Sequence, residues 1–312
     1  HDYKKTIDIK SFYIRRILRI WPLYMGFGLV LIFGIDYAMK LLGTPVNTPV
    51  FVNLFYLLTF SINLQLLFSG INRGIIELYW SVCIEEQFYL VAPWLVKKWF
   101  TKMLYVIIGL ITVGIASKFF MRWLETDQGY HFNNNNPLYF FTLCRIDNFG
   151  IGALAAYIYF RKDLYSKVEK FVTNKWIQVA VALFTILYMI KLVPMPWFEK
   201  TYFFSTTPSV LYAYLILAAS TGHFFVNLEK PLLKSLGKYS YGIYVYHAVL
   251  SQLVLLAFIK WMPAKTVLNY DILYPLACTV ITAVAAALSY EIYEKPFMKL
   301  KQRFTIVKNH ET

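Results

Sequence analysis

Residues 272–290 read ILYPLACTVITAVAAALSY, a run of nineteen residues without a charged side chain. A helix that crosses the hydrocarbon core of a bilayer needs about 20 mostly apolar residues. The run therefore predicts a membrane-crossing helix. Eight comparable segments precede it: Pro22–Ala38, Phe51–Phe68, Val82–Val96, Met103–Met121, Leu138–Phe160, Trp176–Ile190, Pro208–Val226 and Tyr241–Ile259.

The composition of the whole chain agrees with a membrane protein. Of the 312 residues, 58% are apolar and 15% are charged, whereas roughly 25% are charged in an ordinary soluble protein. These values argue against a disordered chain, a coiled coil and a disulfide-rich scaffold. The net charge of +14 is typical of basic cytoplasmic loops in so apolar a chain, so we expect no nucleic-acid partner. The cysteine spacing suggests no metal site.

Five clusters of basic residues orient the segments. They are Lys4, Lys5, Lys10, Arg15, Arg16 and Arg19; Lys97, Lys98 and Lys102; Arg161, Lys162, Lys167, Lys170 and Lys175; Lys230, Lys234 and Lys238; and Lys295, Lys299, Lys301, Arg303 and Lys308. Because positive loops stay in the cytoplasm, both termini are predicted to be cytoplasmic.

The segment Phe51–Phe68 breaks this alternation, because three segments lie between Arg19 and Lys97 and an odd number cannot return to the same side. It contains Asn53, Ser61, Asn63 and Gln65, and such groups are costly facing lipid. We expect a re-entrant or interfacial helix buried against protein. The predicted fold is an all-α polytopic membrane bundle, a single domain over residues 1–312, with about eight crossings and this one additional helix.

Arg16 and Arg19 are three residues apart, so a helix places them on one face. Two planar guanidinium groups at a membrane edge suit phosphate oxygens, and anchoring to lipid head groups is the alternative. Glu85 and Glu86 are adjacent inside an apolar segment, where a carboxylate marks a functional site or a structural ion pair. Trp80 precedes them and is also suited to a membrane interface.

Arg145 lies inside the segment Leu138–Phe160, and it is a candidate partner for Glu85 or Glu86. His247 falls in a predicted polar stripe with Ser240, Tyr244 and Ser251, spaced four, three and four residues apart. A histidine in such a stripe acts as a base or fills a structural role.

Several stretches in this order resemble the motifs of the acyltransferase 3 family of bacterial integral-membrane acyltransferases. They are Arg15–Pro22 with Arg16 and Arg19 in the arginine motif, Trp80-Ser81 through Glu85–Tyr89, Leu236-Gly237 through His247, Glu294–Phe297 and, more loosely, Arg145-Ile146-Asp147 with Gly152. The resemblance covers nearly the whole chain.

The resemblance implies an enzyme of the bacterial inner membrane that moves an acyl group, commonly acetyl from acetyl-CoA, to a hydroxyl of an envelope sugar or glycolipid. Arg16 and Arg19 would hold the acyl-CoA. Glu85, Trp80, Arg145 and His247 would form the catalytic region.

Family members usually begin with two more spans, and the first of these carries the histidine regarded as the general base. The present sequence starts at His1, after that region, so we expect it to be inactive alone. A transporter or flippase for polysaccharide intermediates is the alternative, although such proteins often show paired repeats that this sequence lacks. A non-catalytic membrane subunit is a third interpretation.

Overall fold

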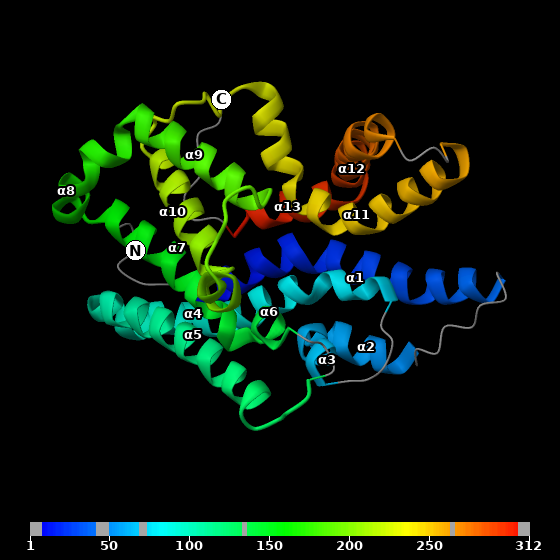
Figure 1. Ribbon diagram of the computed structural model, residues 1–312, viewed down its shortest axis with the longest axis horizontal. Helices are drawn as coiled ribbons and strands as arrows, with labels where there is room; N and C mark the ends of the chain where they lie inside the picture. The colour runs from blue at the N-terminus through cyan, green and yellow to red at the C-terminus, as the bar shows by residue number, and fades with distance from the viewer. Residues whose placement is uncertain (1–7, 42–49, 69–73, 133–135, 263–265, 305–312) are drawn as a thin grey trace. The chain divides into compact units, whose positions relative to one another are not determined.

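The computed structural model describes residues 8–41, 50–68, 74–132, 136–262 and 266–304, and their regular elements are helical (Figure 1). The all-α prediction is therefore confirmed for this part of the chain. Lys4, Lys5 and Lys308 of the predicted cytoplasmic clusters lie outside the described residues. Two compact units are present, and we describe each by itself.

The first unit comprises His1–Ile62, Ile71–Cys83 and Glu229–Thr312. Its helices are α1 (Ile9–Leu41), α2 (Val50–Leu58), a 3₁₀ turn (Gly74–Tyr79), α11 (Pro231–Trp261), π-helical Leu268–Leu273, α12 (Tyr274–Ser289), π-helical Tyr290–Glu294 and α13 (Lys295–Gln302). The π-helical turn Tyr290–Glu294 joins α12 to α13 without a loop.

Two glycines allow close helix packing in the first unit. A Cβ on Gly28 of α1 would lie 2.7 Å from Leu57 Cδ1 of α2, and a Cβ on Gly242 of α11 would lie 3.1 Å from Ala286 Cβ of α12. Small residues let helix backbones approach where the hydrophobic effect does not drive association. The α11 and α12 helices accordingly run side by side (Figure 1).

The second unit comprises Asn63–Gly70 and Ile84–Leu228, so the boundary falls within α4. Its helices are α3 (Ile62–Phe68), α4 (Trp80–Trp99), a 3₁₀ turn (Phe100–Lys102), α5 (Met103–Thr126), α6 (Pro137–Phe140), a 3₁₀ turn (Thr142–Arg145), α7 (Ile146–Phe160), α8 (Lys162–Thr173), α9 (Lys175–Met189), π-helical Glu199–Phe203 and α10 (Thr206–Ser220). The α7 helix packs against both α5 and α10.

Among the residues that the structure describes, four helical stretches are long and apolar enough to cross a membrane, and a fifth results if α8 and α9, bent by 75°, form one broken span. The four are Ile9–Gly34, Ile76–Thr126, Pro231–Trp261 and Leu268–Gln302, and the second contains two of the predicted segments. Eight crossings are therefore not confirmed. The segment Leu138–Phe160 shows why: it breaks into α6, a 3₁₀ turn and α7, whose 15 residues extend only about 22 Å.

The predicted re-entrant or interfacial segment is a pair of short helices. The α2 helix has 9 residues and α3 has 7, and Phe60 between them adopts a positive φ of 50°. Each helix is far shorter than the roughly 30 Å of a hydrocarbon core. Asn53, Asn63 and Gln65 are buried inside protein, as the prediction required.

Candidate functional site

Four cations meet where α1 and α13 pack together in the first unit. Arg15 Nη1 donates a hydrogen bond to Phe304 O, just beyond α13, at 2.8 Å. Lys301 of α13 is close enough to Arg19, Arg16 and Arg15 to be repelled by each of them. Arg15, Arg16 and Lys301 are half-buried and Arg19 is exposed. We call these four residues the basic cluster, and an anion with several charges would relieve its mutual repulsion.

The sequence prediction identified two members of the basic cluster, Arg16 and Arg19. It missed the participation of Arg15 and of Lys301, because both had been assigned to positive cytoplasmic loops. Lys301 lies 282 residues from Arg19 in the sequence, and only the packing of α13 on α1 brings the two together.

A hydrogen-bonded contact joins the start of α4 to α11 within the first unit. Tyr244 donates its hydroxyl proton to Leu78 O at 2.9 Å. The hydroxyl oxygen of Tyr244 also forms a hydrogen bond with Ser81 Oγ. Because the phenol proton is already used, Ser81 is the donor in that second bond. Trp80, next to Ser81, is half-buried.

His247 follows one turn after Tyr244 and is exposed. Its Nδ1 bonds the Tyr244 carbonyl oxygen. A carbonyl can only accept, so Nδ1 carries the proton and Nε2 is left as the basic nitrogen. The other members of the predicted stripe bond elsewhere: Ser240 Oγ donates to Gly237 O, and Ser251 O accepts from Tyr274.

The two adjacent glutamates of α4 lie in different environments. Glu85 is exposed, whereas Glu86 is 9% exposed. The next residue, Gln87, completes a polar network in which its Nε2 donates to Asn63 Oδ1 at 3.0 Å and its Oε1 accepts from Thr142. Asn63 in turn donates to Thr142 Oγ1 at 2.9 Å. This network provides hydrogen-bond partners inside the protein for the amide side chain of Asn63 in α3.

The sequence interpretation placed Arg145 inside a membrane-crossing segment, but the structure interrupts the helix at this residue. It ends a 3₁₀ turn and precedes the first residue of α7. Its guanidinium carbon lies 5.1 Å from the Tyr139 ring centroid and 5.9 Å from that of Phe204, a cation–π geometry. Asp147 also attracts it. Pairing of Arg145 with Glu85 or Glu86 stays a prediction.

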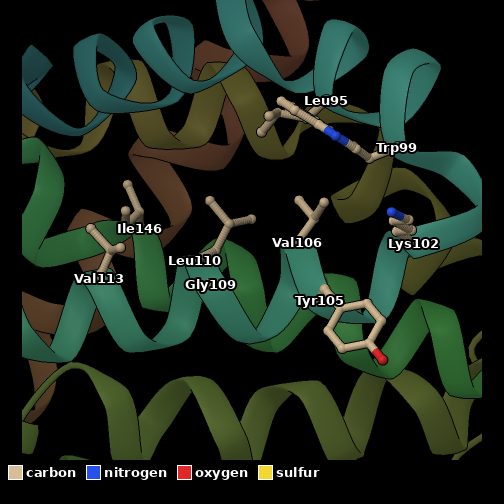
Figure 2. A pocket seen from close by; sticks show the side chains of 9 residues that line it. All are labelled: Leu95, Trp99, Lys102, Tyr105, Val106, Gly109, Leu110, Val113 and Ile146. Atoms are coloured by element: carbon tan, nitrogen blue, oxygen red, sulfur yellow. The ribbon is translucent and has the colours of Figure 1, made fainter.

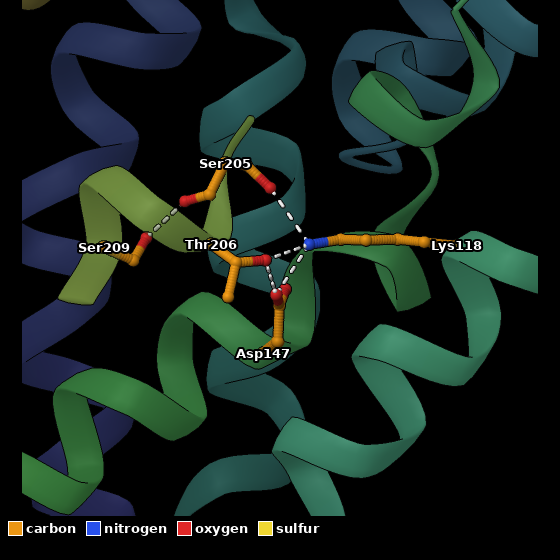
Figure 3. Close-up of polar contacts among 5 residues, drawn as sticks. All are labelled: Lys118, Asp147, Ser205, Thr206 and Ser209. Atoms are coloured by element: carbon orange, nitrogen blue, oxygen red, sulfur yellow. Dashed lines mark hydrogen bonds and ion pairs between the residues drawn. The ribbon is translucent and has the colours of Figure 1, made fainter. Parts of the chain in front are cut away.

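The second unit contains a fully buried ion pair that the sequence interpretation missed (Figure 3). Lys118 of α5 donates to Asp147 Oδ2 of α7 at 2.6 Å, to Thr206 Oγ1 at 2.6 Å and to Ser205 Oγ at 3.1 Å. Thr206 also donates to Asp147 Oδ2 at 2.6 Å. A Cβ on Gly114 would lie 2.5 Å from Asp147 N, so this glycine, one turn before Lys118, allows the close approach. A lone lysine in an apolar 24-residue helix was the available signal.

Among the described residues, no three His, Cys, Asp or Glu side chains gather in a group that could hold a metal ion.

A family model described as an acyltransferase domain matches residues 2–293 of the chain. The chain belongs to the acyltransferase 3 family. Curated relatives include "Putative O-acetyltransferase SACOL0978" from Staphylococcus aureus strain COL, which is 25% identical over 96% of this chain and 49% of its own length. O-acetyltransferase OatA from S. aureus strain NCTC 8325 is 23% identical over the same shares.

The chain spans about half the length of these curated relatives. No solved structure matches it. Membership of the acyltransferase 3 family confirms the resemblance inferred from the motifs. With the apolar helices, it also supports a membrane protein.

Proposed function

We propose that the protein is a membrane O-acyltransferase that moves an acyl group, in the first instance acetyl, from acyl-CoA to a hydroxyl of a cell-envelope polysaccharide or glycolipid. Family membership supports the reaction class, since its relatives are named as O-acetyltransferases. The observation that carries the donor assignment is the basic cluster. Its four cations lie on two helices that pack together, α1 and α13, and the phosphate groups of CoA would neutralise them.

The proposed chemistry is attack of the acceptor hydroxyl oxygen on the thioester carbonyl carbon. The new C–O bond forms, the C–S bond breaks, and the hydroxyl proton goes to a general base while CoA leaves as the thiol. Such a base typically contributes about 10²–10⁴-fold. The family resemblance assigns this role to a histidine.

Among the residues of this chain, Arg16 and Arg19 would hold CoA phosphates. Trp80 and Glu85 would face the acceptor. Arg145 would stabilise negative charge that develops on the thioester oxygen. His247 has a basic Nε2 and would pass a proton.

The proposed membrane arrangement places eight crossings in the bacterial inner membrane, with both ends of this sequence in the cytoplasm. The basic residues support it. Lys97 and Lys98 lie in the last turn of α4 and Lys102 in the 3₁₀ turn before α5, while Arg161 and Lys162 lie at the junction of α7 and α8. Positive loops are held on the cytoplasmic side. The basic cluster would then face the compartment that holds CoA.

The donor assignment is tested by measuring CoA binding to the purified chain in detergent by calorimetry. We expect Arg19→Ala to weaken CoA binding by about 10- to 100-fold, because a hydrogen bond to a charged group contributes roughly 1.5–3 kcal/mol. Arg161→Ala is the control, since this exposed arginine pairs with Asp163 and lies in the other unit. Equal CoA affinity in both variants contradicts the assignment, and absence of CoA binding by the unmodified chain favours a transporter.

A further inference from the structure

An apolar groove of about 400 Å³ lies between α4 and α5 in the second unit (Figure 2). Leu95 and Trp99 of α4 form one side, and Val106, Leu110 and Val113 of α5 form the other. Lys102 and Ile146 lie at its opposite ends (Figure 2). The volume falls within the range of about 300–1,000 Å³ of small-molecule sites.

The length of the groove matches one leaflet of a bilayer. From Lys102 to Val113 the chain advances by eleven residues of α5, which corresponds to about 16 Å of helix. Half of a hydrocarbon core is about 15 Å. The groove therefore extends from the basic end of α5 to the depth at which a phospholipid acyl chain ends.

Gly109 lies in the groove and has no packing reason to be glycine. A Cβ at Gly109 would meet no atom within 4 Å among the described residues, whereas a Cβ at Gly114 or Gly150 would lie within 3 Å of a neighbouring helix. Glycine inside a helix costs roughly 0.5–1 kcal/mol relative to alanine. A side chain at residue 109 would project into the open space of the groove.

The basic end of the groove fits an anionic head group. Lys97, Lys98 and Lys102 are all exposed, and none of them forms an ion pair with any residue that the structure describes. The Lys98 ammonium lies 4.9 Å from the Trp99 ring centroid. Lysine beside tryptophan at the end of a spanning helix is typical of the membrane interface.

We propose that this groove is a binding site for one anionic glycerophospholipid, with an acyl chain along Val106–Val113 and the phosphate at Lys102. The site is independent of the proposed acyl transfer, because none of its residues belongs to the basic cluster or to the catalytic candidates. Its occupant is distinguished from bulk lipid by the charge at one end and the cavity over Gly109.

The test compares lipid retention by native mass spectrometry after purification of the chain from membranes in mild detergent, with added phosphatidylglycerol or phosphatidylcholine. We expect one phosphatidylglycerol per chain and little phosphatidylcholine. Gly109→Trp fills the groove and should abolish retention, whereas Ile108→Trp places the same side chain at an adjacent exposed position of α5 and should not. Lys102→Glu should lower retention roughly tenfold, and Lys167→Glu, an exposed lysine of α8, should leave it unchanged.

Equal retention by both tryptophan variants, or equal retention of the two lipids, overturns the proposal. Preferential retention of an isoprenoid phosphate over phosphatidylglycerol also overturns it, and so does a second protein chain in place of lipid. If Gly109→Trp does not fold, the unmodified protein is tested by cross-linking with phosphatidylglycerol that carries a photoactivatable acyl chain. Cross-links along Tyr105–Val113 support the proposal, and cross-links confined to other helices refute it.

Discussion

Replacement of Lys118 by methionine should destabilise the protein strongly, because it removes the cation from a buried ion pair. Lys118 and Asp147 have side-chain exposures of 1% and 0%. The variant would leave a carboxylate buried with Thr206 as its remaining donor. Breaking a buried pair by removing one partner costs about 3–5 kcal/mol, and we expect a loss in this range for Lys118→Met.

The double variant Lys118→Met with Asp147→Leu should recover most of that loss. Replacing both members of a buried pair by apolar groups of similar size is often neutral, or stabilising by about 1–4 kcal/mol. The ammonium also bonds Ser205 and Thr206, and Thr206 donates to Asp147. In the double variant the Ser205 hydroxyl therefore loses one partner and the Thr206 hydroxyl loses two, so we expect recovery to be incomplete. The double variant should still be more stable than Lys118→Met alone.

The measurement is unfolding in mixed micelles with increasing denaturing detergent, followed by circular dichroism, for the two single variants and the double variant. Arg161→Met is the matched control, because Arg161 and Asp163 form an exposed pair with side-chain exposures of 53% and 59%, and surface pairs contribute little. The reasoning is refuted if Lys118→Met costs under about 1 kcal/mol, or if the two single losses simply add in the double variant.

Three further predictions concern helix packing, one hydrogen bond and the membrane topology. Gly242→Leu should cost about 1–3 kcal/mol by overpacking against Ala286, and Gly237→Leu, where a Cβ meets no described atom, should cost much less in the same unfolding assay. Tyr244→Phe should cost about 1 kcal/mol and free the hydroxyl of Ser81, and unchanged stability would show that this contact contributes nothing. A reporter fused between α5 and α6 should lie outside the cell membrane and one fused between α7 and α8 inside it, and the same side for both contradicts the eight-crossing arrangement.

The sequence predicted the helical class well, because that property depends on composition and on the length of apolar runs. It also predicted that Phe51–Phe68 differs from its neighbours, since Asn53, Asn63 and Gln65 cannot face lipid at low cost. The structure buries all three. Both inferences depend only on which residue types occur within one segment, and the sequence gives these directly.

Helix breaks were harder to predict, because apolar composition does not distinguish a continuous helix from an interrupted one. Leu138–Phe160 is mostly apolar, and its main polar side chains are Thr142, Arg145, Asp147 and Asn148. Tertiary contacts accompany its interruption: Asn63 Nδ2 donates a hydrogen bond to Phe140 O, and Thr142 Oγ1 donates to Gln87 Oε1. Polar partners from α3 and α4 thus satisfy backbone and side-chain groups that a continuous helix would have satisfied itself.

The charged residues divide into two kinds that the sequence alone could not separate. Lys118 is compensated, because Asp147 and two hydroxyls surround its ammonium, and such a group is explained by structure alone. In the basic cluster, Arg15, Arg16 and Arg19 lie close enough to Lys301 to repel it. Folding does not favour such an arrangement by itself, because it raises the electrostatic energy of the native state. A ligand with several negative charges would turn this repulsion into binding energy, so the basic cluster is the stronger candidate for function.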